Sequence, residues 1–266
     1  MISFELVRAY DGINLYRGGA VAKLELNRPE RLNALNFQLA TQLLGLLQEA
    51  AADPSVRSVL ITGAGRAFSS GNDMLQPVPA DSELRNVLRE IYYPIFRTVR
   101  GMPKPVISAA NGPVAGIGVA LALGADLVLA AESAYFLLAH INIGVPPDGG
   151  TLPLVASRVG FSRATEMAML GERIGAARAL DWGLINQVWP DTELKARAEE
   201  LAVRMANGPT RSYAGIKREL NAWTFTQLEE ALELEQAVVA ELRDTADAAE
   251  GRAAFIAKRP SQFSGR

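Results

Sequence analysis

The pattern of apolar and polar positions predicts strands and helices in turn along the first hundred residues. Residues 13–16 and 20–27 read as two strands that a glycine pair separates. Leucines then recur at helical spacing after a candidate helix cap at Asn36. The segment VRSVLITGAG reads as a buried strand that runs into a glycine turn, and residues 83–100 are expected to form an amphipathic helix.

The middle of the chain continues this alternation. PKPVISAANG reads as a strand, AGIGVALALG as a short apolar helix, and DLVLAA and AYFLLA as two further strands. A last strand is expected at LINQVW, beyond several short amphipathic helices. Strands that alternate with helices indicate an α/β core with parallel pairing.

The last third of the chain is predicted to be helical. Residues 191–257 show helical periodicity, with breaks at 208–209 and near 223–224. Each of these helices has one apolar face, which must cover a core or a neighbouring subunit. We therefore divide the chain into an α/β region, residues 1–190, and a helical region, residues 191–266.

Composition removes several classes of function. A net charge of −2 over 266 residues disfavours nucleic acid as a partner. The absence of cysteine excludes disulfides and thiolate chemistry, and a single histidine excludes a histidine-rich zinc site, so no metal is expected. The amino-terminal residues lack the layout of a signal peptide, and no apolar run reaches about 18 residues. We expect a soluble, cytoplasmic protein with no membrane partner.

Two glycine-containing loops follow predicted strands. Residues 67–73, AFSSGND, lie where ligand sites form in α/β proteins, and their small side chains let a ligand approach the main chain. Residues 111–118, NGPVAGIG, lead into a helix whose first N–H groups suit a developing negative charge. Ordinary turns are the alternative for each loop. Together the two loops favour an oxyanion hole with two backbone donors.

The only histidine, His140, lies close in sequence to Asp148. A lone histidine is commonly a structural residue, and an aspartate before two glycines is commonly a turn former or a helix cap. The apolar neighbours of Asp148 favour a second interpretation, in which partial burial raises its pKa towards a value useful for general acid–base catalysis.

With these pieces in order, the chain resembles the crotonase (enoyl-CoA hydratase/isomerase) superfamily over nearly all of its length. The motifs that carry the resemblance are LNRPERLNAL, AFSSGND, KPVISAANGPVAGIGVALALGADLVLAAESAYF, IGVPPDGGTLPLVASRVG, ALDWGLINQV and EGRAAFIAKRPSQF. The resemblance implies an α/β fold built as a spiral of ββα units, with a carboxy-terminal helical trimerisation region. It also implies homotrimers, often paired into hexamers.

The resemblance further implies an acyl-CoA thioester substrate and no separate cofactor, since coenzyme A enters as part of the substrate. The backbone N–H groups of Asn72 and Ile117 occupy the two oxyanion positions of the family. The residues that would contact coenzyme A are Ala67, Ser69, Ser70, Phe255 and Lys258. Apolar and aromatic residues of the variable segment are expected to shape the acyl pocket, namely Leu88, Ile91, Tyr92 and Phe96.

The catalytic acids are where the chain departs from the hydratases of this family. Those enzymes use two glutamates, at the positions that match Ala120 and His140. Asp148 instead lies where several isomerases of the family carry their acidic residue. We therefore expect an enoyl-CoA isomerase that uses Asp148 as its acid and base, with His140 lining the pocket or orienting the carboxylate.

Two other functions stay open. The β-diketone hydrolases of the superfamily act on ketones with a His–Asp pair, and their histidine position matches His140, although the spacing to Asp148 differs by one residue. The third alternative is an enoyl-CoA hydratase with atypical catalytic residues, or a weakly active acyl-CoA binder. The sequence does not give the acyl group.

Overall fold

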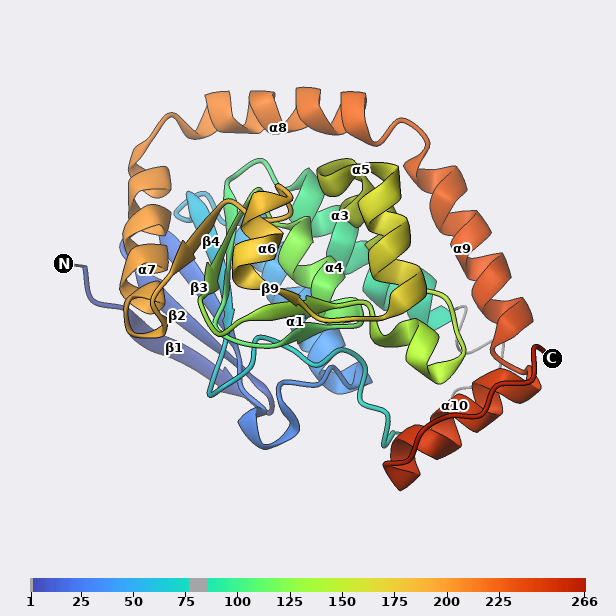
Figure 1. Ribbon diagram of the computed structural model, residues 1–266. Coiled ribbons are helices and arrows are strands. Elements are labelled where there is room, and N and C mark those ends of the chain that lie inside the picture. The colour runs from blue at the N-terminus through green and yellow to red at the C-terminus, as the bar shows by residue number, and fades with distance from the viewer. Residues whose placement is uncertain (1, 77–85) are drawn as a thin grey trace.

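The computed structural model describes residues 2–76 and 86–266 and contains two β-sheets (Figure 1). The larger has seven strands in the order β1-β2-β3-β4-β5-β7-β10. Pairing is antiparallel from β1 to β3. From β3 to β10 it is parallel, as the alternation of elements predicted. The strands are β1 Glu5–Tyr10, β2 Ile13–Gly18, β3 Val21–Leu26, β4 Ser58–Gly63, β5 Val106–Ala110, β7 Leu127–Ala131 and β10 Gln187–Trp189.

The smaller sheet is the one that lies at the candidate loops. It contains three short strands, and β8 lies between β6 and β9. The strand expected in AYFLLA is β8, but it joins this second sheet and not the first. Its strands are β6 Val114–Ala115, β8 Tyr135–Leu137 and β9 Ile174–Gly175.

Helices cover the large sheet on both sides (Figure 1). Asn36 caps α1 as predicted, because its side chain accepts a hydrogen bond from the Leu39 N–H. The helix expected over residues 83–100 is described from residue 86 onwards, and its start lies outside the described residues. Its first part, η2, is a π-helical turn, and α4 is buried along its whole length. The bounds are η1 Pro29–Arg31, α1 Phe37–Ala52, η2 Leu88–Tyr92, α3 Tyr93–Gly101 and α4 Ile117–Gly124.

The carboxy-terminal helices form an arc around this core (Figure 1). The predicted breaks separate α7 from α8 and α8 from α9, and a further break separates α9 from α10. Gly160, with φ of 76°, bends α5. Among the described residues no helix has the length and apolar character needed to cross a bilayer. The bounds are η3 Ala139–Ile143, α5 Thr151–Leu170, α6 Ala176–Asp181, α7 Asp191–Asn207, α8 Thr210–Thr224, α9 Leu228–Leu242 and α10 Ala246–Ala257.

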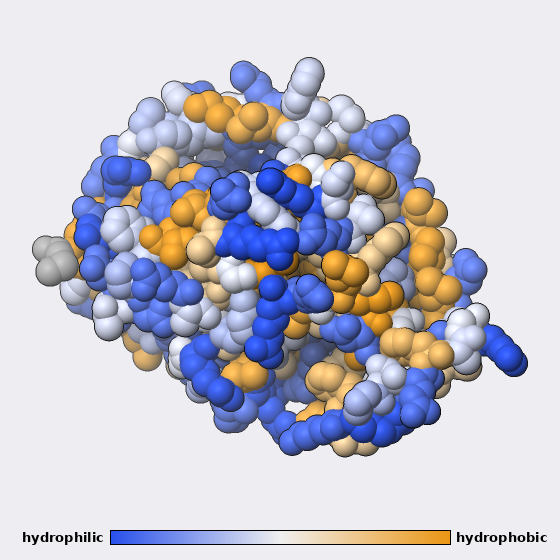
Figure 2. Space-filling view, viewed as in Figure 1, coloured by the Kyte–Doolittle hydropathy of each residue, from blue (hydrophilic) through white to orange (hydrophobic). Residues whose placement is uncertain are grey.

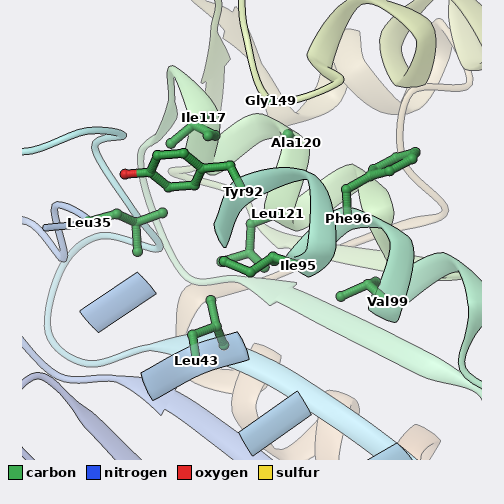
Figure 3. Close-up of a pocket in the computed structure, with 10 residues that line it drawn as sticks. All are labelled: Leu35, Leu43, Tyr92, Ile95, Phe96, Val99, Ile117, Ala120, Leu121 and Gly149. Atoms are coloured by element: carbon green, nitrogen blue, oxygen red, sulfur yellow. The ribbon is translucent and has the colours of Figure 1, made fainter. Parts of the chain in front are cut away.

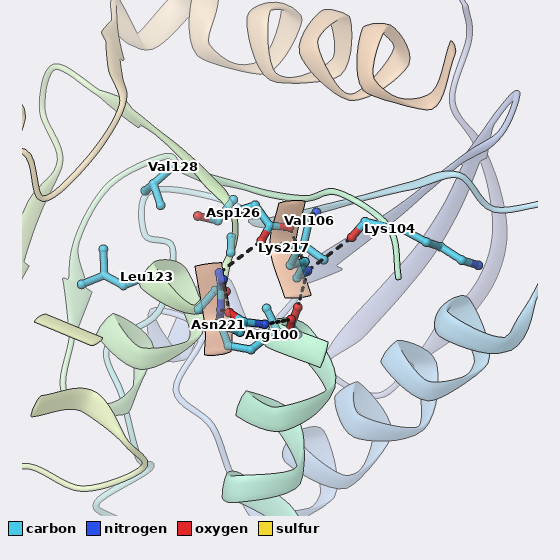
Figure 4. A network of polar contacts seen from close by, with 12 residues as sticks. Arg100, Lys104, Val106, Leu123, Asp126, Val128, Lys217 and Asn221 are labelled. Atoms are coloured by element: carbon cyan, nitrogen blue, oxygen red, sulfur yellow. Dashed lines mark hydrogen bonds and ion pairs between the residues drawn. The ribbon is translucent and has the colours of Figure 1, made fainter. Parts of the chain in front are cut away.

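A buried ionic network fastens α8 to the core (Figure 4). The Asp126 carboxylate accepts hydrogen bonds from Lys217 Nζ at 2.8 Å and from Arg100 Nη1 at 3.1 Å. Lys217 also donates to the carbonyl oxygen of Val99, and Arg100 donates to that of Gly124, near the ends of α3 and α4. Burial lowers the pKa of the Lys217 ammonium group. The network therefore depends on the single negative charge of Asp126.

Asp126→Asn is expected to lower the free energy of unfolding by about 3 kcal/mol, because it leaves two buried cations without their counter-charge. Urea denaturation measures this loss. Glu229→Gln is the matched control, since Glu229 pairs with Arg97 at the surface, and that pair should contribute at most about 1 kcal/mol. Equal losses in the two variants would contradict the assignment.

Candidate active site

Close backbone packing joins the two candidate loops. Ser69 of the first loop and Val114 of the second form a parallel bridge. The first loop then passes against Gly116 of the second. Gly71 has a φ of +92°, and a Cβ atom there would lie 2.9 Å from the carbonyl oxygen of Ala115. Only glycine combines that backbone conformation with so close an approach. The loops predicted from sequence therefore lie side by side.

The backbone N–H groups of Asn72 and Ile117 are left available by this arrangement. The Leu35 N–H donates to Gly71 O, and the Asp73 N–H donates to Leu35 O, so the N–H of the residue between them faces the other way. Ile117 is the first residue of α4, where N–H groups have no partner within the helix. Across residues 2–76 and 86–266, no hydrogen bond is found for either N–H. Both can donate to a ligand oxygen.

His140 and Asp148 also meet here. His140 lies in η3 and is 7% exposed, with its Nε2 atom 3.5 Å from Asp148 Oδ1. This distance exceeds that of a normal hydrogen bond. The same Nε2 atom lies 3.9 Å from the position that a Cβ atom would take at Gly116. The imidazole is thus in contact with the carboxylate and next to the loop before Ile117.

The carboxylate of Asp148 does not cap a helix, so that interpretation of the sequence is wrong. The residue at the cap of α5 is Gly150, and no side chain caps that helix. The backbone carbonyl of Asp148, not its carboxylate, accepts from the Thr151 N–H and hydroxyl. Gly149 brings the turn against α4, since a Cβ atom there would lie 2.6 Å from Ile117 Cδ1. The carboxylate is left free to act on a ligand.

Buried polar atoms without partners gather at this place. Within the described residues they include Asn72 Oδ1, Tyr92 Oη, His140 Nδ1 and Asp148 Oδ1. Nearly all buried polar atoms in folded proteins have a hydrogen-bond partner. A cluster of unpaired buried polar atoms around two free N–H groups is typical of a binding site, where the ligand supplies the missing hydrogen-bond partners.

A narrow apolar cavity of about 20 Å³ adjoins the cluster (Figure 3). Tyr92 and Phe96, both expected in the acyl pocket, lie in its wall, and Ala120 lies there too. Leu88 is fully buried and Ile91 half-buried, and neither lines the cavity. Its lining consists of Leu35, Leu43, Tyr92, Ile95, Phe96, Val99, Ile117, Ala120, Leu121 and Gly149.

In the AFSSGND loop, the three residues that were expected to contact coenzyme A are held by contacts within the protein itself. Ala67 and Ser69 are buried, and Ser69 Oγ donates to Asn33 O at 2.9 Å. Ser70 is half-buried and its hydroxyl donates to Arg31 O at 3.3 Å. The main chain of this loop is thus held in place by its own serines.

The carboxy-terminal tail approaches the same region. Phe255 is 55% exposed, and Lys258 is exposed and ends α10 with a φ of 54°. Gly251 packs α10 onto η3, because a Cβ atom there would lie 2.4 Å from the carbonyl carbon of Ile143. Arg252 Nη2 donates to Gln76 O at 3.0 Å. The helix that carries Phe255 and Lys258 therefore packs directly on the element that carries His140.

Sequence analysis missed Glu235, on α9. Its carboxylate accepts the N–H of Gly150, with N–O distances of 3.1 and 3.2 Å. Burial and the negative charge of Asp148 raise the pKa of Glu235 to about 8. The group is therefore mostly uncharged at neutral pH. The signal was present, because Leu232, Glu235 and Val239 share the helical spacing of the buried face.

The raised pKa of Glu235 predicts a pH dependence of stability. An unfolded glutamate ionises near pH 4.3, whereas the folded one keeps its proton up to about pH 8. Stability is thus lost as the pH rises between these values, by at most about 1.4 kcal/mol per unit. When the pH rises from 5 to 8, the free energy of unfolding of Glu235→Gln should fall by less than that of the wild type. Urea unfolding at the two pH values measures this difference.

Glu233→Gln is the matched control for this measurement, since Glu233 lies on the same helix and is exposed. It should follow the wild-type pH dependence. A Glu235→Gln variant with the wild-type dependence would show that Glu235 is ionised in the folded protein.

Comparison with known proteins agrees with this geometry. The Enoyl-CoA hydratase/isomerase family matches residues 17–266. A 1,2-epoxyphenylacetyl-CoA isomerase of Escherichia coli is 41% identical over 253 residues, which cover 92% of this chain and 95% of that protein. A Rhodobacter capsulatus protein named "Probable enoyl-CoA hydratase" is 38% identical over 258 residues, 97% of this chain and 100% of that protein.

A solved structure shows the same fold. The crystal structure of an enoyl-CoA hydratase from Mycobacterium avium subsp. paratuberculosis superposes with a TM-score of 0.88 at 38% sequence identity. It covers 96% of this chain and 100% of that one. The family match over nearly the whole chain, the shared fold and the two free N–H groups agree with one another. The chain belongs to the enoyl-CoA hydratase/isomerase, or crotonase, family.

Proposed function

We propose that the protein is an acyl-CoA isomerase in which Asp148 is the single acid and base. One observation carries the proposal. The positions that the family resemblance assigns to the two hydratase glutamates hold Ala120 and His140. The mostly buried Asp148 carboxylate, whose Oδ1 atom has no hydrogen-bond partner among the described residues, lies beside the candidate oxyanion hole. Alanine cannot move a proton, and hydration needs groups that position a water as well as groups that move protons.

The geometry supports a 1,3-proton shift. With a 3-enoyl thioester bound, the N–H groups of Asn72 and Ile117 would hold the carbonyl oxygen. The Asp148 carboxylate would take a proton from C2, and the electron pair of that C–H bond would delocalise as a dienolate with its charge on the oxygen. The same proton would return to C4, which moves the double bond to C2–C3. Each oxyanion donor would stabilise the intermediate by about 3–4 kcal/mol.

The names of the relatives support both an isomerase and a hydratase. The Escherichia coli relative is named an isomerase, and the Rhodobacter capsulatus relative carries a hydratase name. The chemistry of this chain's own residues favours the isomerase. A mass-spectrometric screen against 3-enoyl, 2-enoyl and aromatic-ring CoA thioesters, with a β-diketone included, would identify the substrate.

Asp148→Asn is expected to lower kcat on that substrate by roughly 10²- to 10⁴-fold, because the amide keeps the shape but cannot accept the proton. Steady-state kinetics measures kcat, and calorimetric titration with a non-reactive acyl-CoA checks that the variant still binds. Wild-type turnover in this variant would remove Asp148 from the mechanism.

A second candidate function rests on the contact between His140 and Asp148. Nε2 of the histidine lies 3.5 Å from the carboxylate, an arrangement that a hydrolase of C–C bonds could use with the histidine as base. Such an enzyme would act on a β-diketone without coenzyme A. Binding of coenzyme A thioesters separates the two candidates.

His140→Ala tests the two candidates in turnover. The isomerase should lose less than about 10-fold in kcat, since the imidazole only lines the site and Asp148 moves the proton. The hydrolase should become inactive on the β-diketone. A variant that binds acyl-CoA normally but is inactive would count against the isomerase.

We also propose that residues 191–266 form an oligomerisation region. Apolar side chains are exposed along α8 and α9, where Figure 2 shows orange surface, and Trp223 is 85% exposed and Leu234 66% exposed. Large apolar groups of this kind mark interaction surfaces. This supports a homotrimer or hexamer, and it would leave Phe255 and Lys258 able to meet coenzyme A of the same or an adjacent subunit.

A further inference from the structure

The hydroxyl of Tyr92 is buried and unused. The residue is 4% exposed, and within the described residues its oxygen has no hydrogen-bond partner. The neighbouring Tyr93 is equally buried, at 3% exposed, but its hydroxyl donates to Leu232 O at 3.1 Å. The fold therefore provides a partner for one of two adjacent tyrosines and none for the other.

Among the described residues that line the cavity, Tyr92 alone has a polar side chain. The other lining residues are aliphatic side chains, the ring of Phe96 and Gly149. Figure 3 shows the Tyr92 oxygen at the end of the cavity where Ile117 and Leu35 lie, opposite Phe96. Ile117 carries one candidate oxyanion donor, and Leu35 is bridged to the residue that carries the other. The hydroxyl thus lies on the side where an acyl chain would enter.

The local backbone also holds Tyr92 in this position. It ends η2, the π-helical turn over residues 88–92, just before α3. Single π-helical turns within α-helices occur frequently at functional sites. Burial and the charge of Asp148 raise the pKa of the phenol, so it keeps its proton and acts as a donor.

We propose that Tyr92 is a specificity-determining residue that donates a hydrogen bond to an oxygen atom on the acyl chain of the substrate. The chemical class is then an oxygenated acyl-CoA, with an oxo, hydroxyl or epoxide oxygen beyond the thioester carbonyl. This inference rests on the proposed acyl-CoA site and adds the substrate class to it.

The physical reason is that a buried polar group costs more free energy when it is left unpaired than a hydrogen bond typically contributes when it forms. A hydrocarbon chain bound beside Tyr92 would leave its hydroxyl unpaired, whereas an acceptor oxygen on the chain would satisfy it. Sites built to pair with a polar group discriminate strongly against the analogue that lacks it. We expect the oxygenated ligand to bind at least about 10-fold more tightly than its hydrocarbon match.

The test compares matched acyl-CoA pairs by calorimetric titration of the full-length protein. The pairs are acetoacetyl-CoA with butyryl-CoA, and 2-hydroxyphenylacetyl-CoA with phenylacetyl-CoA. Wild-type protein should prefer the oxygenated member of at least one pair, and Tyr92→Phe should reduce that preference by about 10-fold. Because Tyr92→Phe removes an oxygen that bonds to nothing in the described residues, its thermal midpoint should not fall.

Tyr93→Phe is the matched control. It removes a bonded hydroxyl one residue away, so it should lower the thermal midpoint and keep the wild-type preference. Tyr92→Phe with an unchanged preference, or wild-type protein with no preference in either pair, overturns the inference; the hydroxyl then pairs with a buried water. In either case normal acyl-CoA binding would leave the proposed isomerase standing, whereas loss of binding to every CoA thioester would contradict both.

Discussion

The site depends on the close approach of three backbone segments at glycine. Gly71 meets Ala115, Gly116 lies beside His140, and Gly149 meets Ile117. Each of these glycines has a positive φ, so a side chain would strain the backbone, and at Gly71 and Gly149 it would also collide with the facing segment. This packing places two free N–H groups and one carboxylate, from three distant parts of the sequence, around one space.

Charge at the site is kept to a single carboxylate. Asp148 is mostly buried, and a second negative charge nearby would be costly in a medium of low dielectric. Glu235 and Tyr92 both respond to Asp148, since its charge contributes to raising the pKa of each. Both are therefore neutral near pH 7, and in the proposed isomerase they would donate hydrogen bonds without competing with Asp148 as the base. An apolar cavity beside one charged group suits a reaction in which negative charge moves onto the substrate.

The sequence predicted what local patterns control. The strands β2 to β5, the cap at Asn36 and the two loops follow from alternation, helical spacing and glycine, which act over a few residues. The role of Asp148 could not be decided locally, because whether its carboxylate caps α5 depends on the turn geometry at Gly149 and Gly150. The sequence reasoning also missed β1, whose residues are mostly exposed, and the very short strands β6 and β9.

Glu235 was missed for a related reason. Glutamates recur along α9 and most of them face solvent, so composition gives no reason to single one out. Its environment comes from residues 85 or more positions away, such as Gly150 and Asp148, and rules based on local sequence do not reach that far. The helical region of residues 191–266 is thus in physical contact with the chemistry of the core. Lys217 makes a second such link through Asp126.

At the two positions that the family resemblance assigns to the hydratase glutamates, the chain has Ala120 and His140. The small side chain of Ala120 and the ring of Tyr92 line the same cavity (Figure 3). The neutral phenol in this wall can hold an oxygen atom by a hydrogen bond, but it cannot take a proton at neutral pH. His140 at the other glutamate position contacts Asp148 without a hydrogen bond at 3.5 Å. In the proposed isomerase, proton transfer is then left to Asp148, and recognition of the substrate to the groups around it.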